Sequence, residues 1–240
     1  MSLTSSQIEV CNKALLKIGS KTITSEDTAV EARVCNAMYQ ITVDELLAAH
    51  TWSCAIKQAV LITDEEDVLG RYLYPLPSDF IRIVEVNRRP LIDIEFEVIG
   101  QNLATQESNT IMEWQNGLYY PATMPVVSDD VYYQCNTSHR AADADLDKPS
   151  VSDKWDEVDA STYIHIKYIS SIEPEQFNSM FMSCLIPLLA SNLATSLSTS
   201  QSKSINLINE YRMKLQDARR IDNSQRKTLQ PNNSWNRNRR

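Results

Sequence analysis

Segments with helical periodicity lie at both ends of the chain, and segments with strand-like periodicity lie between them. Near the N-terminus, apolar residues recur at helical spacing over residues 8–18, behind a capping-box pattern formed by Ser6 and Glu9, and Gly19 follows as a C-cap. A second helix is predicted over residues 28–49, with an apolar stripe suited to packing on another helix.

The last third of the chain returns to helical periodicity. Residues 177–193 carry one broad apolar face, Pro174 and its flanking acids mark a helix start, and Pro187 is expected to kink this helix. A final helix is predicted over residues 203–221. Helices from both ends therefore bracket the middle of the chain, and we expect them to pack together as one bundle.

The middle of the chain contains alternating patterns and many β-branched residues, which indicate a sheet. Strands are predicted over residues 54–62, 71–76, 80–87, 92–99, 110–114, 131–135 and 163–169. Pro75 and Pro77 fix an extended stop between two of these strands. The predicted fold class is α+β, with a helical bundle built from the N- and C-terminal helices, a central β segment and a small β-rich insertion.

These patterns divide the chain into five parts. Residues 1–62 are predicted to be the N-terminal helices of the bundle, residues 63–114 the central β segment, and residues 115–160 an inserted β/loop module. Residues 161–221 are predicted to be a strand followed by the C-terminal helices, and residues 222–240 a basic extended tail.

Glycine is scarce, with 4 residues in 240, and the four glycines lie far apart. No phosphate-binding loop, dinucleotide fingerprint or nucleophile elbow can be assembled from them, which excludes most nucleotide-dependent enzymes. No serine or threonine lies in a nucleophile signature, and His50, His139 and His165 are predicted to be structural. We therefore expect no enzymatic activity, no catalytic residue and no cofactor.

The five cysteines are odd in number, widely spaced and without a CxxC pair, so neither a zinc site nor a disulfide framework is expected. They are predicted to be buried structural thiols. Asp143, Asp145 and Asp147 have the spacing of a calcium loop, but the glycine and glutamate that such a loop needs are missing. A solvated acidic loop is expected there instead, and no metal site.

No membrane or export segment is expected. Residues 1–9 are polar and lack the apolar core of a signal peptide. The most apolar stretch, residues 180–194, is too short to span a bilayer and is interrupted by polar residues and a proline. These observations favour a soluble protein folded in a reducing compartment.

Charge is distributed unevenly along the chain. The formal net charge is −8, but residues 212–240 carry nine basic residues against two acidic ones, so the tail has a charge of +7 and residues 1–211 have −15. A basic tail on an acidic body is typical of an arm that docks on an acidic partner or on nucleic acid. A solvated, disordered terminus is the alternative, and Trp235 favours docking.

Several motifs follow one another along about 190 residues. The N-terminal motifs are Ile8-x-x-Cys11-Asn12-x-Ala14-Leu15-x-x-Ile18-Gly19, Glu31-Ala32-x-x-Cys35-x-x-x-Tyr39 and Leu46-Leu47-x-x-His50-x-Trp52. The later motifs are Tyr74-Pro75-Leu76-Pro77-Ser78-Asp79-Phe80, Phe177-x-x-x-Phe181-x-x-x-Leu185 and Leu189-Ala190-x-x-Leu193-Ala194. In this order they resemble the head-to-tail adaptors of short-tailed bacteriophages, also called tail tubular protein A.

This resemblance implies a structural virion protein rather than an enzyme. Adaptors of this family form a ring, typically of twelve copies, between the portal protein and the tail nozzle protein. The ring lies at the head–tail junction of the virion and is assembled in the host cytoplasm, with no membrane as a partner. Genomic DNA passes through its lumen during ejection. An acidic body suits a channel that DNA slides through, because like charge repels phosphate. The tail residues Trp235, Arg237, Arg239 and Arg240 would then dock on the portal.

The inserted module carries a second, shorter resemblance. Val131-Tyr132-Tyr133-Gln134-Cys135, Ser138-His139 and Trp155 resemble a small chitin-binding type of carbohydrate-binding module. The resemblance implies that Tyr132, Tyr133 and Trp155 stack on sugars, which would make the chain a glycan-binding tail accessory protein that contacts the bacterial surface. The alternative is that these aromatics form the minimal core of a decorative insertion. A cell-wall hydrolase of the tail is a third hypothesis, although paired carboxylates cannot be placed.

Overall fold

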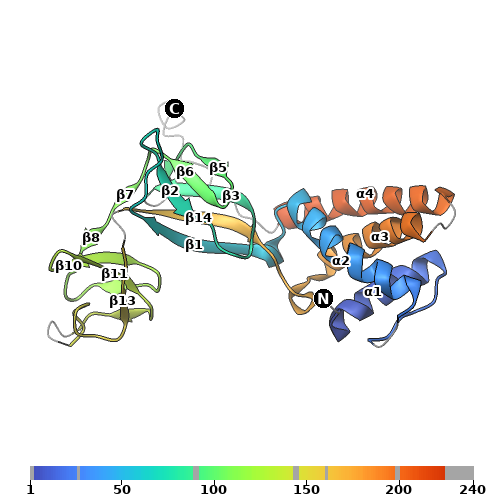
Figure 1. The fold of residues 1–240 in the computed structure, drawn as a ribbon, viewed down its shortest axis with the longest axis horizontal. Helices are drawn as coiled ribbons and strands as arrows, with labels where there is room; N and C mark the ends of the chain where they lie inside the picture. Colours follow the sequence, from blue (N-terminus) through green and yellow to red (C-terminus); the bar gives the residue numbers. More distant parts are fainter. Residues whose placement is uncertain are drawn as a thin grey trace, which may run out of the picture. The chain divides into compact units, whose positions relative to one another are not determined.

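The computed structural model describes residues 3–25, 28–88, 92–142, 146–159, 162–197 and 201–224 (Figure 1). The chain divides into two compact units. The helical unit comprises residues 1–54 and 172–240, and the β unit comprises residues 55–171. Each unit brings together segments that are distant in the sequence.

In its described part, the helical unit contains four α-helices, three of which pack against the fourth, an apolar one. They are α1 (Ser5–Ile18), α2 (Val30–Ala49), α3 (Ser179–Ser196) and α4 (Gln201–Ser224), with the 3-10 turn η2 (Pro174–Gln176) before α3. By length and composition α3 is apolar enough to cross a membrane. In the folded unit α3 packs against α1, α2 and α4, so most of its apolar side chains are buried by the other helices.

Local signals at the helix ends explain where α1 begins and ends. The Thr4 hydroxyl accepts a hydrogen bond from the Gln7 backbone, and the Gln7 side chain accepts one from the Thr4 backbone. The predicted capping box of Ser6 and Glu9 is therefore wrong by two residues. The predicted C-cap is confirmed, because Gly19 adopts a left-handed conformation with φ of 78°.

The described strands of the β unit belong to four sheets. Those strands are β1 (Ile56–Thr63), β2 (Tyr72–Pro75), β3 (Phe80–Arg88), β4 (Ile92–Asp93), β5 (Glu97–Ile99), β6 (Asn102–Thr105), β7 (Asn109–Thr110), β8 (Met112–Glu113), β9 (Tyr119–Tyr120), β10 (Pro125–Ser128), β11 (Val131–Cys135), β12 (His139–Arg140), β13 (Trp155–Glu157) and β14 (Thr162–Ser170). A five-stranded sheet has the order β1-β14-β3-β4, with β7 also on β14, and a three-stranded sheet has the order β2-β6-β5. The inserted module, residues 115–160, contains the pair β12-β9 and three strands of the four-stranded sheet β13-β11-β10-β8, whose fourth strand, β8, comes just before the module.

The main core of the β unit lies between the five-stranded and three-stranded sheets. Ile164 and Ile166 on β14 contribute to it from one sheet, and Tyr74 and Leu103 contribute from the other. The Tyr74 hydroxyl is buried and satisfied by Thr162, whose hydroxyl oxygen lies 2.8 Å away. Sheet-on-sheet packing therefore buries the apolar faces of these strands without helices.

The predicted arrangement of helices and strands within the α+β fold is wrong. A helical bundle of N- and C-terminal helices with a central β segment and a small β-rich insertion was expected. The chain is a mixed α+β protein whose helices are not arranged as a terminal-helix bundle around a central β segment. The physical reason is that the strands form several sheets that bury one another's apolar faces, so they have cores of their own.

Individual strands were predicted with mixed success. The strands over 54–62, 80–87 and 163–169 are confirmed as β1, β3 and β14, with ends shifted by one or two residues. The single strand predicted over 92–99 is wrong, because it is broken into β4 and β5. Short strands such as β6 and β10 were not predicted.

Candidate functional site

A cavity of about 830 Å³ lies on one face of the five-stranded sheet. One wall comes from β1, β14 and β3, and the other comes from Met112 and residues 121–124 of the module. All of these segments belong to the β unit. The cavity therefore depends on the pairing of strands that are about one hundred residues apart in the chain.

Six side chains form two rows across the sheet wall of the cavity. Because side chains alternate between the faces of a strand, residues paired across β1, β14 and β3 share one face. The rows are Val60–His165–Asn87 and Gln58–Lys167–Glu85. The opposite face of β14, with Ile164 and Ile166, belongs to the core between the two sheets.

The charged groups on this wall neutralise each other. Lys167 Nζ lies 3.4 Å from Glu85 Oε1 in an ion pair. His165 is half-buried, its ring contacts the edge of the Tyr163 ring at 5.5 Å, and burial lowers the pKa of its imidazole below the ordinary value of 6.5. The imidazole is therefore neutral at pH 7, and the wall has no net charge at that pH.

The opposite wall includes a residue with a strained backbone. Thr123 has a φ of 72°, which is unfavourable for a β-branched residue. Strand β11 holds it in place, because the Thr123 N–H donates to the Cys135 carbonyl at 2.6 Å and its own carbonyl accepts from the Gln134 amide at 3.1 Å. Strain of this kind is retained where the surrounding structure fixes the backbone, and it is common next to binding sites.

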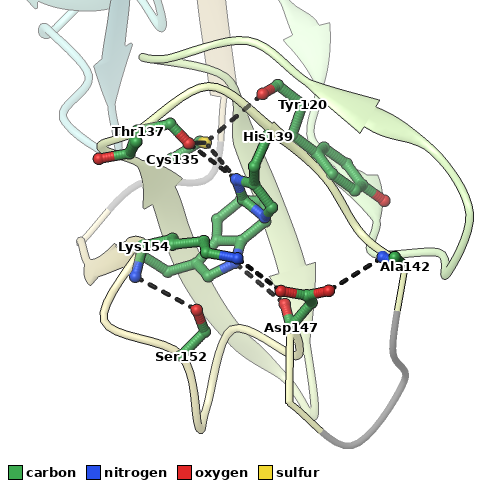
Figure 2. A network of polar contacts seen from close by, with 9 residues as sticks. Tyr120, Cys135, Thr137, His139, Ala142, Asp147, Ser152 and Lys154 are labelled. Carbon is green, nitrogen blue, oxygen red and sulfur yellow. Dashed lines mark hydrogen bonds and ion pairs between the residues drawn. The ribbon is translucent and has the colours of Figure 1, made fainter.

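A second polar cluster lies inside the module (Figure 2). The Asp147 carboxylate accepts from the Ala142 N–H at 2.9 Å and pairs with Lys154 Nζ at 2.6 Å. The Asp147 carbonyl accepts from Trp155 Nε1 at 3.2 Å. The solvated loop expected at Asp147 is therefore wrong for this residue, which is buried and ties the loop to the module core. The neighbouring Asp143 and Asp145 lie outside the described residues.

Cys135 and His139 lie side by side in this cluster but lack the properties of a catalytic pair. Cys135 Sγ is 3.6 Å from His139 Nδ1, yet that nitrogen is only 2.7 Å from the Thr137 carbonyl, which can only accept a hydrogen bond. Nδ1 therefore carries the proton and cannot take one from the thiol. Burial also raises the pKa of Cys135, which disfavours a reactive thiolate. In the described part of the chain, no three His, Cys, Asp or Glu side chains are grouped as metal ligands.

The three residues predicted to stack on sugars do not share an exposed surface. Tyr132 and Tyr133 are half-buried and pack against different apolar clusters, as expected for neighbours on a strand. Trp155 is only 6 % exposed, and its ring meets Tyr120 and His139 edge to face at 5.1 and 5.3 Å. Trp155 is thus a core residue of the module in this fold.

The other predicted site lies in the tail. Trp235, Arg237, Arg239 and Arg240, the expected portal-docking residues, are outside the described residues. The cavity residues were not predicted as a site, and His165 was expected to be structural because it alternates with isoleucines. The only signal in the sequence was that His165 and Lys167 are the polar residues of this alternating strand. Such a signal does not identify the residues of β1 and β3 that pair with them.

Two further features of the described residues are exposed apolar side chains in charged surroundings. One is the turn between β1 and β2, where Val68 is fully exposed and Leu69 is 66 % exposed. The other is the outer face of α4, where Ile205 and Met213 are more than half exposed.

Comparison with known protein families and with curated proteins finds no match for this chain, so the function proposed below rests on its own residues and motifs.

Proposed function

We propose that this chain is a structural, ring-forming head-to-tail adaptor of a short-tailed bacteriophage, situated between the portal and the tail nozzle. The ordered motifs described above suggest the family. The observation that carries the ring is a pair of exposed faces of opposite charge, one in each unit. A ring requires two different, complementary faces on every copy, because each copy contacts the next one head to tail.

The first face is the β1–β2 turn, which is held rigidly. The Asp67 carboxylate accepts hydrogen bonds from the Leu69 N–H at 2.8 Å and from the Arg71 N–H at 3.0 Å. Arg71 also pairs with Asp67 and with Glu97, each at 2.7 Å. Val68 and its neighbour are therefore presented in a fixed conformation, which lowers the entropy cost of binding.

This turn is also strongly acidic. Asp64, Glu65 and Glu66 are its first three residues, and all three are exposed. We call residues 64–70 the acidic turn. A partner for it needs an apolar surface bordered by basic residues, because the turn combines exposed apolar side chains with negative charge.

The second face is the outer side of α4, which has that composition. Leu207, Tyr211, Leu215 and Ala218 form the inner stripe of the helix. Helical spacing places Ile205, Arg212, Met213 and Arg220 on the other side, where Arg220 also forms an exposed ion pair with Asp217 at 3.6 Å. We call these four residues the basic face of α4. A contact between the acidic turn of one copy and the basic face of the next is heterologous, and such contacts generate a ring when the rotation from one copy to the next closes.

Charge also fits a DNA conduit. The β unit has 9 Lys and Arg against 20 Asp and Glu, a formal charge of −11. Affinity for DNA depends mainly on basic side chains that release counterions from phosphates. Because the β unit has this excess of carboxylates, it is not expected to bind DNA tightly. Such a surface suits a channel through which DNA moves.

The direct test combines the full chain with the portal protein of the same phage. Native mass spectrometry is expected to show a multimer of the 27.3 kDa chain bound to portal, and electron microscopy is expected to show a ring. Chain without portal, and portal without chain, serve as controls. A chain that remains monomeric and unbound in the mixture would exclude the adaptor function.

The basic tail gives a second prediction. Removing residues 225–240 leaves α4 complete, since the helix ends at Ser224. If the tail docks on the portal, this truncation weakens portal binding at least tenfold in a pull-down or by surface plasmon resonance. Trp235→Ala in the full chain tests the aromatic anchor separately. Unchanged portal affinity after truncation would show that the tail has no docking role.

A further inference from the structure

The size and walls of the cavity in the β unit are those of a small-molecule site. Its volume of about 830 Å³ lies within the range of 300–1,000 Å³ that is typical of ligand pockets. Val60, Met112, Pro121 and Met124 supply apolar lining. Polar side chains supply the rest, so the cavity suits a ligand with both an apolar and a hydrogen-bonding side.

The charges on the walls favour a neutral ligand. Glu85 and Lys167 are the charged side chains that line the cavity, and they already form an ion pair with each other. A phosphorylated or carboxylated ligand would need a cation free of a carboxylate partner. His165 is neutral at pH 7, and no residue on the opposite wall, Met112 or 121–124, is charged.

The uncharged polar groups match hydroxyl groups. The amide of Gln58 carries both donors and an acceptor, the neutral imidazole of His165 carries one of each, and the amide of Asn87 lies beside them on the same wall. These groups lie in neighbouring rows across three strands, so they face the same space. A hydroxyl group both donates and accepts, and a sugar ring carries several hydroxyls around an apolar C–H face.

The strand arrangement disfavours an extended peptide. Peptides that bind sheets usually add a strand at an edge, where backbone groups are unpaired. Here the cavity lies on the face of the sheet, and the central strand β14 is paired with β1 on one side and β3 on the other. Recognition on this face of the sheet therefore depends mainly on side chains.

We propose that this cavity binds a neutral oligosaccharide, with Gln58 and His165 bonding its hydroxyls, Asn87 lining the same wall, and the module segment 121–124 covering its apolar face. This site is separate from Tyr132, Tyr133 and Trp155. It is also independent of ring formation, since neither the acidic turn nor the basic face of α4 lines it. In a virion, such a site would let the protein hold a glycan in addition to its structural role.

The test is isothermal titration calorimetry of the full chain with chitotriose, maltotriose and mannotriose, and with sialyllactose as a charged control. At least one neutral trisaccharide is expected to bind, and sialyllactose is not. Gln58→Ala is expected to weaken that binding at least tenfold, and Val60→Trp, which places an indole ring beside Gln58 and His165 in the cavity, to abolish it. Gln101→Ala is the matched control, because Gln101 is an exposed glutamine of the same unit that does not line the cavity.

A pH series adds a readout specific to His165. Its pKa is lowered by burial, so the neutral imidazole persists at pH 7 and is protonated only as the pH falls below the ordinary histidine range. Affinity is expected to be constant from pH 8 to about 6.5 and to fall below it. Circular dichroism shows whether each variant is folded.

Two results would overturn the proposal. One is absence of binding by all three neutral trisaccharides at millimolar concentration. The other is binding that Gln58→Ala and Val60→Trp leave unchanged in folded protein, which would place the sugar elsewhere. Ring assembly with portal, measured on the same variants, is expected to be normal, so failure of the sugar site and failure of the adaptor function are distinguishable.

Discussion

Reversing two charges in the acidic turn, E65K/E66K, is expected to abolish ring assembly with the portal. Both side chains are exposed beside Val68 and Leu69, and the proposed partner face carries Arg212 and Arg220. The reversal would place like charges opposite each other at every joint of the ring, where each such contact costs several kcal/mol. Native mass spectrometry with portal should then show chains that do not associate with one another.

A second set of reversals makes this result specific. Combining E65K/E66K with R212E/R220E restores opposite charges at each joint and is expected to restore the ring. D153K/E157K is the matched control, because it makes the same change in charge at two exposed acids of the module. If E65K/E66K assembles like the wild type, the acidic turn is not the ring contact, although the adaptor function would stand.

Replacing Trp52 by alanine is expected to have the largest effect on stability. Trp52 is fully buried in the helical unit, where its Nε1 donates to the Leu46 carbonyl at 2.6 Å. Its ring packs edge to face against Phe181 and His50, each at 5.1 Å. Removing a buried tryptophan leaves a cavity and takes away a hydrogen bond to the Leu46 carbonyl, so Trp52→Ala should lower the free energy of unfolding by about 3–5 kcal/mol.

Urea unfolding followed by circular dichroism at 222 nm measures this loss. Trp52→Phe is the control, because it keeps most of the buried ring and loses only the hydrogen bond, so a decrease of about 1–2 kcal/mol is expected. A loss below about 1 kcal/mol for Trp52→Ala would contradict the central packing role of this side chain in the helical unit.

Local sequence patterns predicted the ends of helices and the longer strands most reliably. Gly19 marks the end of α1 because a left-handed C-cap depends on glycine itself, and the alternation over 163–169 identifies β14 because the strand is long. The capping box was misplaced by two residues because Ser6 with Glu9 and Thr4 with Gln7 fit the same pattern. Only the backbone conformation shows which of the two overlapping capping patterns is the real one.

Contacts across long separations were not available from the sequence. Glu85 and Lys167 are 82 residues apart, and their pairing depends on a β14–β3 register that shifts immediately after Lys167. Trp155 was expected on a sugar-binding surface, but the Asp147 loop and His139 enclose it in the module core. A tryptophan in a small module suits both roles, and only packing distinguishes them.

The sequence by itself determined which segments become helices, which become the longer strands, and how charge is divided along the chain, because these follow from short-range periodicity and composition. The tertiary structure alone decided that the strands pack sheet on sheet instead of within a helical bundle, and that Gln58, His165 and Asn87 line one cavity. The physical reason is that strand pairing and register depend on backbone hydrogen bonds between distant segments, which no local pattern specifies.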